Sequence, residues 1–222
     1  MHILVFDTET TGLPKRRDSS VTDPEEFPHI VQLSYIVYDM QSDDLLVVSD
    51  NIIKVDDAID IPEDSVKIHK ISKEISREKG IPIKDALMQF VKDLSTCSLL
   101  VAHNIEFDIN MITVELVRLN RLTETEEINE AYALFSGVSK YCTMSENKKL
   151  CNILATSKAG KVFVKYPSLT ELHLKMFQTV PNYMHNSLND ILICLRCYYY
   201  QKTRLDICDK NLEIKELLKY LL

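Results

Sequence analysis

A short apolar run at the start of the chain, residues 2–7, ends in acidic side chains and a turn. The run is partly β-branched and breaks at Thr10-Thr11-Gly12-Leu13-Pro14, which is typical of a buried strand followed by a tight turn. Asp7 and Glu9, two residues apart, then point to one face of the strand's end. Like charges at that distance raise each other's pKa unless cations offset them. Taken by itself, this pattern fits either a metal site or a solvated turn.

The rest of the chain places strands early and helices afterwards. Residues 30–39 and 45–55 read as strands joined by a turn at 41–44, and residues 99–102 form another short apolar strand. Helical patterns follow or intervene over 62–79, 83–94, 107–119, 168–177, 187–204 and 210–222. This order predicts an α/β fold, in which helices flank a mixed sheet and a meander of strands precedes the first helix.

The length and composition favour one domain. A chain of 222 residues with 45% hydrophobic content can bury one good core, so we expect a single domain over 1–222. We interpret the acidic and turn-rich segment around 120–166 as an insertion in that domain. No run approaches the ~18 apolar residues of a membrane span, and the opening run is too short for a signal peptide. We therefore expect a soluble, cytoplasmic protein without a membrane partner.

Six cysteines show no regular framework, and an intracellular chain keeps them as thiols. Only Cys194 and Cys197 have the spacing of a metal or redox pair. They lie in an apolar helical run, and a second pair to complete a zinc site is missing. Buried core thiols are therefore favoured over zinc.

The formal net charge of −7 argues at first against a nucleic-acid partner, because phosphate affinity usually comes from Lys and Arg. An enzyme that binds phosphate through divalent cations instead needs acids at its centre and only a local basic rim. Lys15-Arg16-Arg17 and Lys148-Lys149 are candidates for that rim. Both runs also fit ordinary solvated surface charge.

Two further segments supply acids after buried runs. Asp108 follows the strand at 99–102, in the first turn of a predicted helix, and Asp190 follows His185 by five residues. Ligands of open α/β sheets collect at strand and helix ends, so these segments converge easily with Asp7. An alternative for Asp190 is a capping box with Ser187 at the start of the last long helix.

The chain resembles the DEDDh (DnaQ-like) 3′→5′ exonucleases, and is similar to the proofreading epsilon subunit of bacterial DNA polymerase III. The first family motif matches residues 6–13, Phe-Asp-Thr-Glu-Thr-Thr-Gly-Leu. The second matches Ala102-His103-Asn104 with Phe107-Asp108, and the third matches His185 and Asp190. Weaker matches include 68–71, where lysine stands in place of the usual glycine, and 166–172.

The resemblance implies a ribonuclease-H-like fold and a metal-dependent active site. Two Mg²⁺ or Mn²⁺ ions would be held by four carboxylates, those of Asp7, Glu9, Asp108 and Asp190. His185 would act as the general base, for which its ordinary pKa near ~6.5 is suitable. Hard oxygen ligands favour these ions over zinc.

The resemblance also implies contacts to the substrate, made by Thr10, Gly12, Leu13, His69 and Asn104. The backbone at Thr10 and Gly12 would hold the terminal nucleotide, and Leu13 would wedge against its base. An N-cap role for Asn104 in the following helix is equally open. His103 is expected to be structural and Phe107 to be part of the core.

These features predict an exonuclease that releases nucleoside 5′-monophosphates from the 3′ end of single-stranded nucleic acid, with DNA favoured. An RNA-trimming enzyme is the nearest alternative, because a pocket for a 2′-OH leaves no legible motif. A DNA polymerase is a further candidate partner. From another class, a non-catalytic polymerase-associated binding module is the alternative.

Overall fold

The computed structural model describes residues 1–123 and 125–222. Its centre is a five-stranded mixed sheet in the order β3-β2-β1-β4-β5. β2 runs antiparallel to β1 and β3, whereas β4 and β5 run parallel to β1. The strands are β1 (His2–Thr10), β2 (Ile30–Asp39), β3 (Asp44–Ile52), β4 (Leu99–Ala102) and β5 (Ser139–Cys142). The predicted α/β fold with a meander of strands before the first helix is confirmed.

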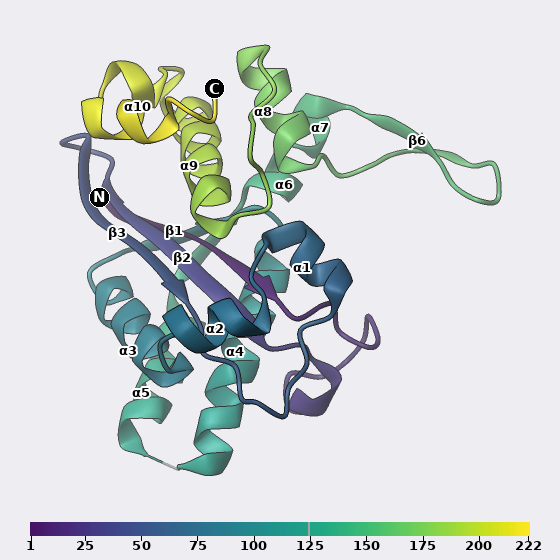
Figure 1. Cartoon of the computed structure of the whole chain (residues 1–222). Coiled ribbons are helices and arrows are strands. Elements are labelled where there is room, and N and C mark those ends of the chain that lie inside the picture. Colours follow the sequence, from purple (N-terminus) through teal and green to yellow (C-terminus); the bar gives the residue numbers. More distant parts are fainter. Residues whose placement is uncertain (124) are drawn as a thin grey trace.

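Helices cover both faces of the sheet, and a separate two-stranded hairpin leaves the body (Figure 1). The helices are α1 (Glu63–His69), α2 (Lys73–Lys79), α3 (Ile83–Leu94), α4 (Ile105–Leu122), α5 (Glu126–Gly137), α6 (Thr143–Glu146), α7 (Lys148–Cys151), α8 (Leu169–Phe177), α9 (Ser187–Thr203) and α10 (Leu212–Leu218). Short 3-10 turns lie at Pro24–Glu26 and Ile207–Asp209, and the hairpin consists of β6 (Leu154–Thr156) and β7 (Val162–Val164).

Alternation along β1 divides the hydrophobic core into two layers. Leu4 and Phe6 pack with α3, α4 and α5 on one face, whereas Ile3 and Val5 pack with α9 and α10 on the other. Because side chains alternate across a strand, Asp7 continues the Ile3 and Val5 series toward α9. The strand thereby delivers its acids to the face that the last long helix covers.

The segment 120–166 contributes to the main sheet as well as to its surface. β5 lies within it and pairs with β4 from Leu99↔Ser139 to Ala102↔Cys142. A turn between Ser157 and Lys161 closes the β6–β7 hairpin, and α5 also lies within this segment. The part of the segment that leaves the body is therefore the hairpin. Among the described residues, no helix has the length and apolarity that crossing a membrane requires.

Arg118 on α4 makes several of the hydrogen bonds that hold the loop after β1. The Arg118 guanidinium donates hydrogen bonds to the backbone carbonyls of Pro24, Phe27 and Pro28 and pairs with Glu115 at 2.7 Å. Loops without such partners have unsatisfied backbone groups and move more freely. The anchored loop keeps the turn after β1 in a fixed position beside the sheet.

Candidate functional site

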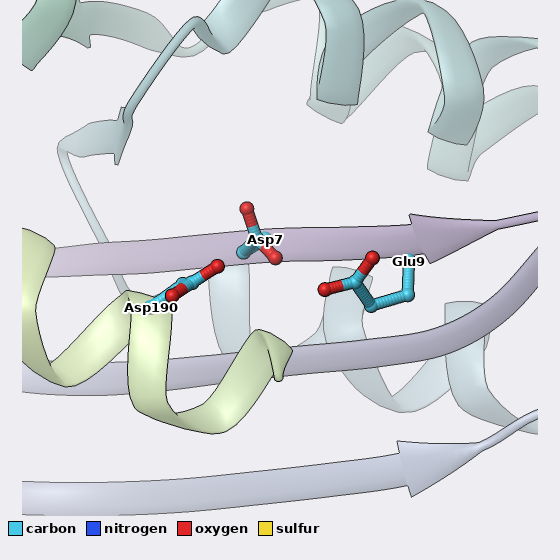
Figure 2. Close-up of side chains that lie close together, drawn as sticks. All are labelled: Asp7, Glu9 and Asp190. Carbon is cyan, nitrogen blue, oxygen red and sulfur yellow. The ribbon is translucent and has the colours of Figure 1, made fainter. Parts of the chain in front are cut away.

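Three carboxylates meet where β1 ends against α9 (Figure 2). Asp7 and Glu9 come from β1, and Asp190 comes from the first turn of α9. One oxygen from each lies within 4.8 Å of the others. Figure 2 shows the Asp7 and Glu9 side chains on the same side of the strand, facing Asp190. A cluster of this size can surround a small cation with oxygen ligands.

Asp108, the fourth predicted acid, lies beside this cluster and is bound to β1. Its Oδ1 accepts hydrogen bonds from the Thr8 backbone N–H at 3.0 Å and from the Thr8 hydroxyl at 2.8 Å. The pairing of β1 with the short strand β4 ends at Val5↔Val101, so the N–H of Thr8 needs another acceptor. Asp108 is 2% exposed, and its other carboxylate oxygen makes no hydrogen bond within the described residues.

The pKa of each of the four acids is raised, and the charges of neighbouring acids contribute to this for Asp7, Glu9 and Asp108. Burial is the largest cause for each, and it raises the pKa of Glu9 to about 8 and those of Asp108 and Asp190 to about 7. The pKa of Asp7 is raised well above its ordinary value, by burial and then by the charges of the other three acids. No lysine, arginine or histidine of the described chain forms an ion pair with them. Bound cations would supply the charge that the site lacks.

The start of α9 is fixed to the central strands, and this determines where Asp190 lies. The Ser187 hydroxyl donates to the Asp7 carbonyl at 2.8 Å, and the Ser187 N–H donates to Gln32 Oε1. The capping box proposed for Ser187 and Asp190 does not form. Asn186 caps the helix instead, by accepting from Asn189 N–H, because Ser187 is already used against β1. Asp190 is thereby left to face the acidic cluster.

His185 lies just before α9, close to Asp190 along the chain. Its backbone N–H donates to Asp190 Oδ1 at 3.3 Å, and its side chain is exposed. The residue has φ 68°, and Tyr183 nearby has φ 54°. Left-handed backbone at non-glycine residues is strained and is often found at functional sites. The imidazole makes no hydrogen bond within the described residues, so it is free to contact a ligand of the acidic site.

A small cavity adjoins the acids on the side of α1. It has a volume of about 290 Å³, and α1, α4 and the end of β1 contribute to it. Its lining residues are Thr8, Glu9, Thr10, Gly12, Leu13, Ser65, Ile68, His69 and Phe107. Four of the five predicted substrate contacts therefore line one cavity. Ser65 and Ile68 were missed by sequence reasoning, since nothing in the short pattern of α1 shows which side faces the turn after β1.

The turn after β1 is held by a hydrogen bond within it and exposes Leu13 beside the cavity. The Thr10 hydroxyl donates to the Gly12 carbonyl at 2.6 Å, and Gly12 has φ 155°. Leu13, which follows, is 79% exposed, although a leucine normally gains from burial. An exposed apolar side chain at the mouth of a cavity provides a surface on which a flat, apolar group can pack.

His69 is buried at the end of α1, and its Nδ1 accepts from Ile71 N–H at 3.0 Å. Its Nε2 is buried without a hydrogen-bond partner within the described residues, and such a polar atom normally has one. Lys70 adopts φ 64°, the left-handed conformation that glycine takes most easily. The lysine at this position therefore keeps the backbone turn that a glycine would form.

Asn104 and Phe107 differ from the sequence expectations, whereas His103 agrees with them. α4 begins at Ile105, and Asn104 occupies the N-cap position with φ 67° and without a side-chain capping hydrogen bond. The N-cap alternative therefore applies to its position and not to its side chain. His103 is structural, as expected: its ring contacts the Thr143 hydroxyl and the Pro167 carbonyl. Phe107, expected in the core, is only partly buried and lines the cavity.

The cysteines take no part in this site. Cys194 and Cys197 are free thiols on the buried side of α9, within the core, and burial raises the pKa of both. A buried thiol with a raised pKa stays protonated, whereas a metal ligand must be a thiolate. The preference for core thiols over zinc agrees with this arrangement.

Comparisons with known proteins agree with the fold. The RNase_T exonuclease family model matches residues 4–198. Escherichia coli exonuclease I bound to a dT13 oligonucleotide is 16% identical with a TM-score of 0.62, over 91% of this chain and 41% of that one. Exonuclease I of Methylocaldum szegediense is 15% identical with a TM-score of 0.62, and the match covers the same shares of the two chains. Exonuclease X bound to 5′ overhanging duplex DNA is 19% identical with a TM-score of 0.53, over 96% of this chain and 98% of that one.

The sheet order and the acidic cluster thus define a nuclease-type domain with a ribonuclease-H-like fold, as the motifs predicted. The chain belongs to the exonuclease family, since the family model covers most of its length. It spans 41% of the length of the exonuclease I chains, so it corresponds to part of those proteins. No curated protein matches the sequence.

Proposed function

We propose that this protein is a divalent-cation-dependent 3′→5′ exonuclease that acts on single-stranded nucleic acid, with DNA favoured over RNA, and releases nucleoside 5′-monophosphates. The observation that carries this proposal is the convergence of Asp7, Glu9 and Asp190 beside a cavity that opens at the end of β1. The solved complexes of similar fold hold a dT13 oligonucleotide and 5′ overhanging duplex DNA, which supports DNA as the substrate.

The residues fit two Mg²⁺ or Mn²⁺ ions, because they offer only oxygen ligands and lack positive partners. Asp7, Glu9, Asp108 and Asp190 would hold these ions, with Asp7 central because it adjoins the other three. When bound, such ions activate a water and stabilise the leaving 3′-oxygen. Thr8 keeps Asp108 oriented through two hydrogen bonds, which leaves one carboxylate oxygen available.

His185 would accept the proton of the attacking water. Its imidazole is exposed, and its backbone is bound to Asp190, so the ring and a metal ligand move together. A general base must lie within about 2.6–3.2 Å of the proton that it removes, in some cases only once substrate is bound.

The cavity would hold the 3′-terminal nucleotide. A volume of about 290 Å³ is at the lower limit of small-ligand pockets, so it suits one nucleoside and excludes paired bases. The backbone at Thr10 and Gly12 would hold the nucleotide, with Leu13 packed against the base and His69 Nε2 donating to it. Asn104, outside the lining, would contact the adjacent strand. Removal of one terminal nucleotide at a time would follow from a cavity of this size.

The experiment uses 5′-labelled 20-nucleotide DNA and RNA single strands with Mg²⁺, Mn²⁺ or EDTA. Shortening in single steps from the 3′ end, with nucleoside 5′-monophosphates as products and no cleavage in EDTA, is the expected result. The preferred strand decides between DNA and the RNA-trimming alternative. If neither strand shortens with any metal, the enzyme proposal fails and the non-catalytic binding module replaces it.

Matched variants test the roles of individual residues. Asp7→Asn should abolish cleavage, whereas Asp18→Asn, an exposed aspartate in the loop after β1, should not change it. His185→Ala should lower kcat by about 10²–10⁴, the usual contribution of a general base, with His2→Ala as the control. Full activity in Asp7→Asn would contradict the assigned site. The proposal includes no polymerase partner, because the activity needs only the chain and its substrate.

A further inference from the structure

The segment 148–167 has a charge pattern unlike the rest of the chain. It contains five lysines and no aspartate or glutamate, whereas the whole chain carries a formal net charge of −7. The segment comprises α7, the β6–β7 hairpin and the residues that lead into α8. Within the described residues only Lys165 forms an ion pair, with Glu171. The lysines at 148, 149, 158 and 161 form none.

The hairpin exposes apolar side chains together with these charges. Figure 1 shows it extending away from the body of the protein. Leu154, Val162 and Phe163 are 66%, 59% and 44% exposed. An isolated two-stranded hairpin is only marginally stable in water, and its two open edges have unpaired backbone groups. Exposed apolar groups on such an element are typical of a surface that binds a partner.

The register of the hairpin places a phenylalanine between two lysines. Ala155 pairs with Phe163, and the ladder continues through Ser157 N–H to the Lys161 carbonyl and Lys165 N–H to the Ile153 carbonyl. Because side chains alternate along an extended chain, Phe163 on β7 and Lys161 and Lys165, which flank β7, lie on one face of the hairpin. The small side chain of Ala155 opposite leaves the ring accessible. A ring flanked by cations is suited to stack on a base while the cations bind phosphates.

The root of the hairpin is fixed to the segment before α4, the helix that carries Asp108. Lys148 lies over the Tyr166 ring at 4.2 Å, and Lys165 Nζ lies 2.6 Å from Glu171 Oε1. The Pro167 carbonyl is bound to His103 Nε2 at 3.1 Å, and His103 lies just before α4, the helix that carries Asp108. The hairpin is therefore anchored at its base and free at its tip.

We infer that the β6–β7 hairpin is a nucleic-acid-binding arm, which holds the single strand several nucleotides away from the end that enters the acidic site. Phe163 stacks on a base, and Lys158 and Lys161, both toward the tip of the hairpin, bind phosphates. This inference rests on the proposed function for the identity of the strand. Charge complementarity with phosphate and the exposed ring favour a single strand over a protein or a membrane as the occupant.

The test uses an arm variant and a control with the same loss of charge and of one aromatic ring. The arm variant is Lys158→Ser/Lys161→Ser/Phe163→Ala, and the control is Lys92→Ser/Lys215→Ser/Tyr220→Ala, all at exposed positions. Binding of a fluorescent 20-nucleotide single strand is measured in EDTA by anisotropy. Cleavage of 20-nucleotide and 4-nucleotide strands is measured with metal.

The arm variant should bind the long strand at least about 10-fold more weakly, while the control keeps wild-type affinity. The slope of log Kd against log salt should decrease by about 1.4, since each phosphate contact of a single strand contributes about 0.7. Phe163→Ala alone should weaken binding about 5-fold or more, as expected for loss of one stacked base. The ratio of kcat/KM for long over short strands should fall with affinity.

Unchanged affinity and salt slope in the arm variant would overturn the inference, and so would an equal loss on the long and short strands. The binding measurement in EDTA does not depend on catalysis. If the wild type degrades both strands and the arm variant degrades them equally well, the inference about the arm is refuted and the proposed function is supported. If the wild type binds the strand but cleaves nothing, and the arm variant loses that binding, the inference about the arm is supported and the proposed function is refuted.

Discussion

Replacing Glu9 by glutamine should make the metal-free protein more stable at alkaline pH. Burial, with Asp190 and Asp108 nearby, raises the pKa of Glu9 from its ordinary value of 4.5 to about 8. A carboxyl group whose pKa is higher in the folded state binds more protons there than in the unfolded state. Wild-type stability therefore falls as the pH rises from about 4.5 through about 8. Glutamine carries no charge, so the variant avoids this loss.

The magnitude follows from the size of the pKa change. At about 1.36 kcal/mol per pKa unit, a pKa that rises from 4.5 to about 8 corresponds to an upper limit of about 5 kcal/mol. Glu9 is partly exposed, and the four acids share their protons, both of which lower this value. We expect the variant to be about 2 kcal/mol more stable at pH 8.5, a Tm increase of about 4–8 °C for a chain of this size.

The assay is thermal and urea unfolding in EDTA at pH 5 and pH 8.5, and again at pH 8.5 with 10 mM Mg²⁺. Wild type and variant should differ little at pH 5 and most at pH 8.5. Mg²⁺ should stabilise the wild type more than the variant, because only the wild type keeps all four ligands. Glu25→Gln, at an exposed position, should show neither effect. A variant less stable than the wild type at pH 8.5 in EDTA would refute the reasoning.

Two further predictions concern the support of the site and of the fold. Thr8→Val removes the 2.8 Å hydrogen bond from the Thr8 hydroxyl to Asp108 and should cost about 1 kcal/mol of stability. The affinity for Mn²⁺, measured by calorimetry, should fall in Thr8→Val and recover in Thr8→Ser. An unchanged affinity in Thr8→Val would contradict a positioning role for Thr8. Gly80→Ala would place a Cβ 2.2 Å from the Ser76 carbonyl oxygen and 2.5 Å from Lys54 N, so urea unfolding should show a loss of at least about 2 kcal/mol. Gly137→Ala, with nothing within 4 Å of the new Cβ, is the control and should not lose stability.

Local patterns in the sequence determined the elements and part of the site. Apolar runs and their turn residues located the central strands, and the spacing of apolar residues located α3, α4 and α9. The alternation of a strand placed Asp7 and Glu9 on one face, which needs no knowledge of the rest of the chain. The family resemblance came from the same short motifs, and the family model confirms it.

Tertiary structure decided which groups meet at the end of β1. Asp190 reaches Asp7 because Ser187 binds the Asp7 carbonyl, and this bond left helix capping to Asn186. Asp108 is oriented by Thr8, one hundred residues away along the chain. Likewise β5 joins the sheet from within a segment interpreted as an insertion. Local sequence fixes periodicity and turns over a few residues, whereas these contacts depend on packing between distant segments, which leaves no signal in the spacing of either one.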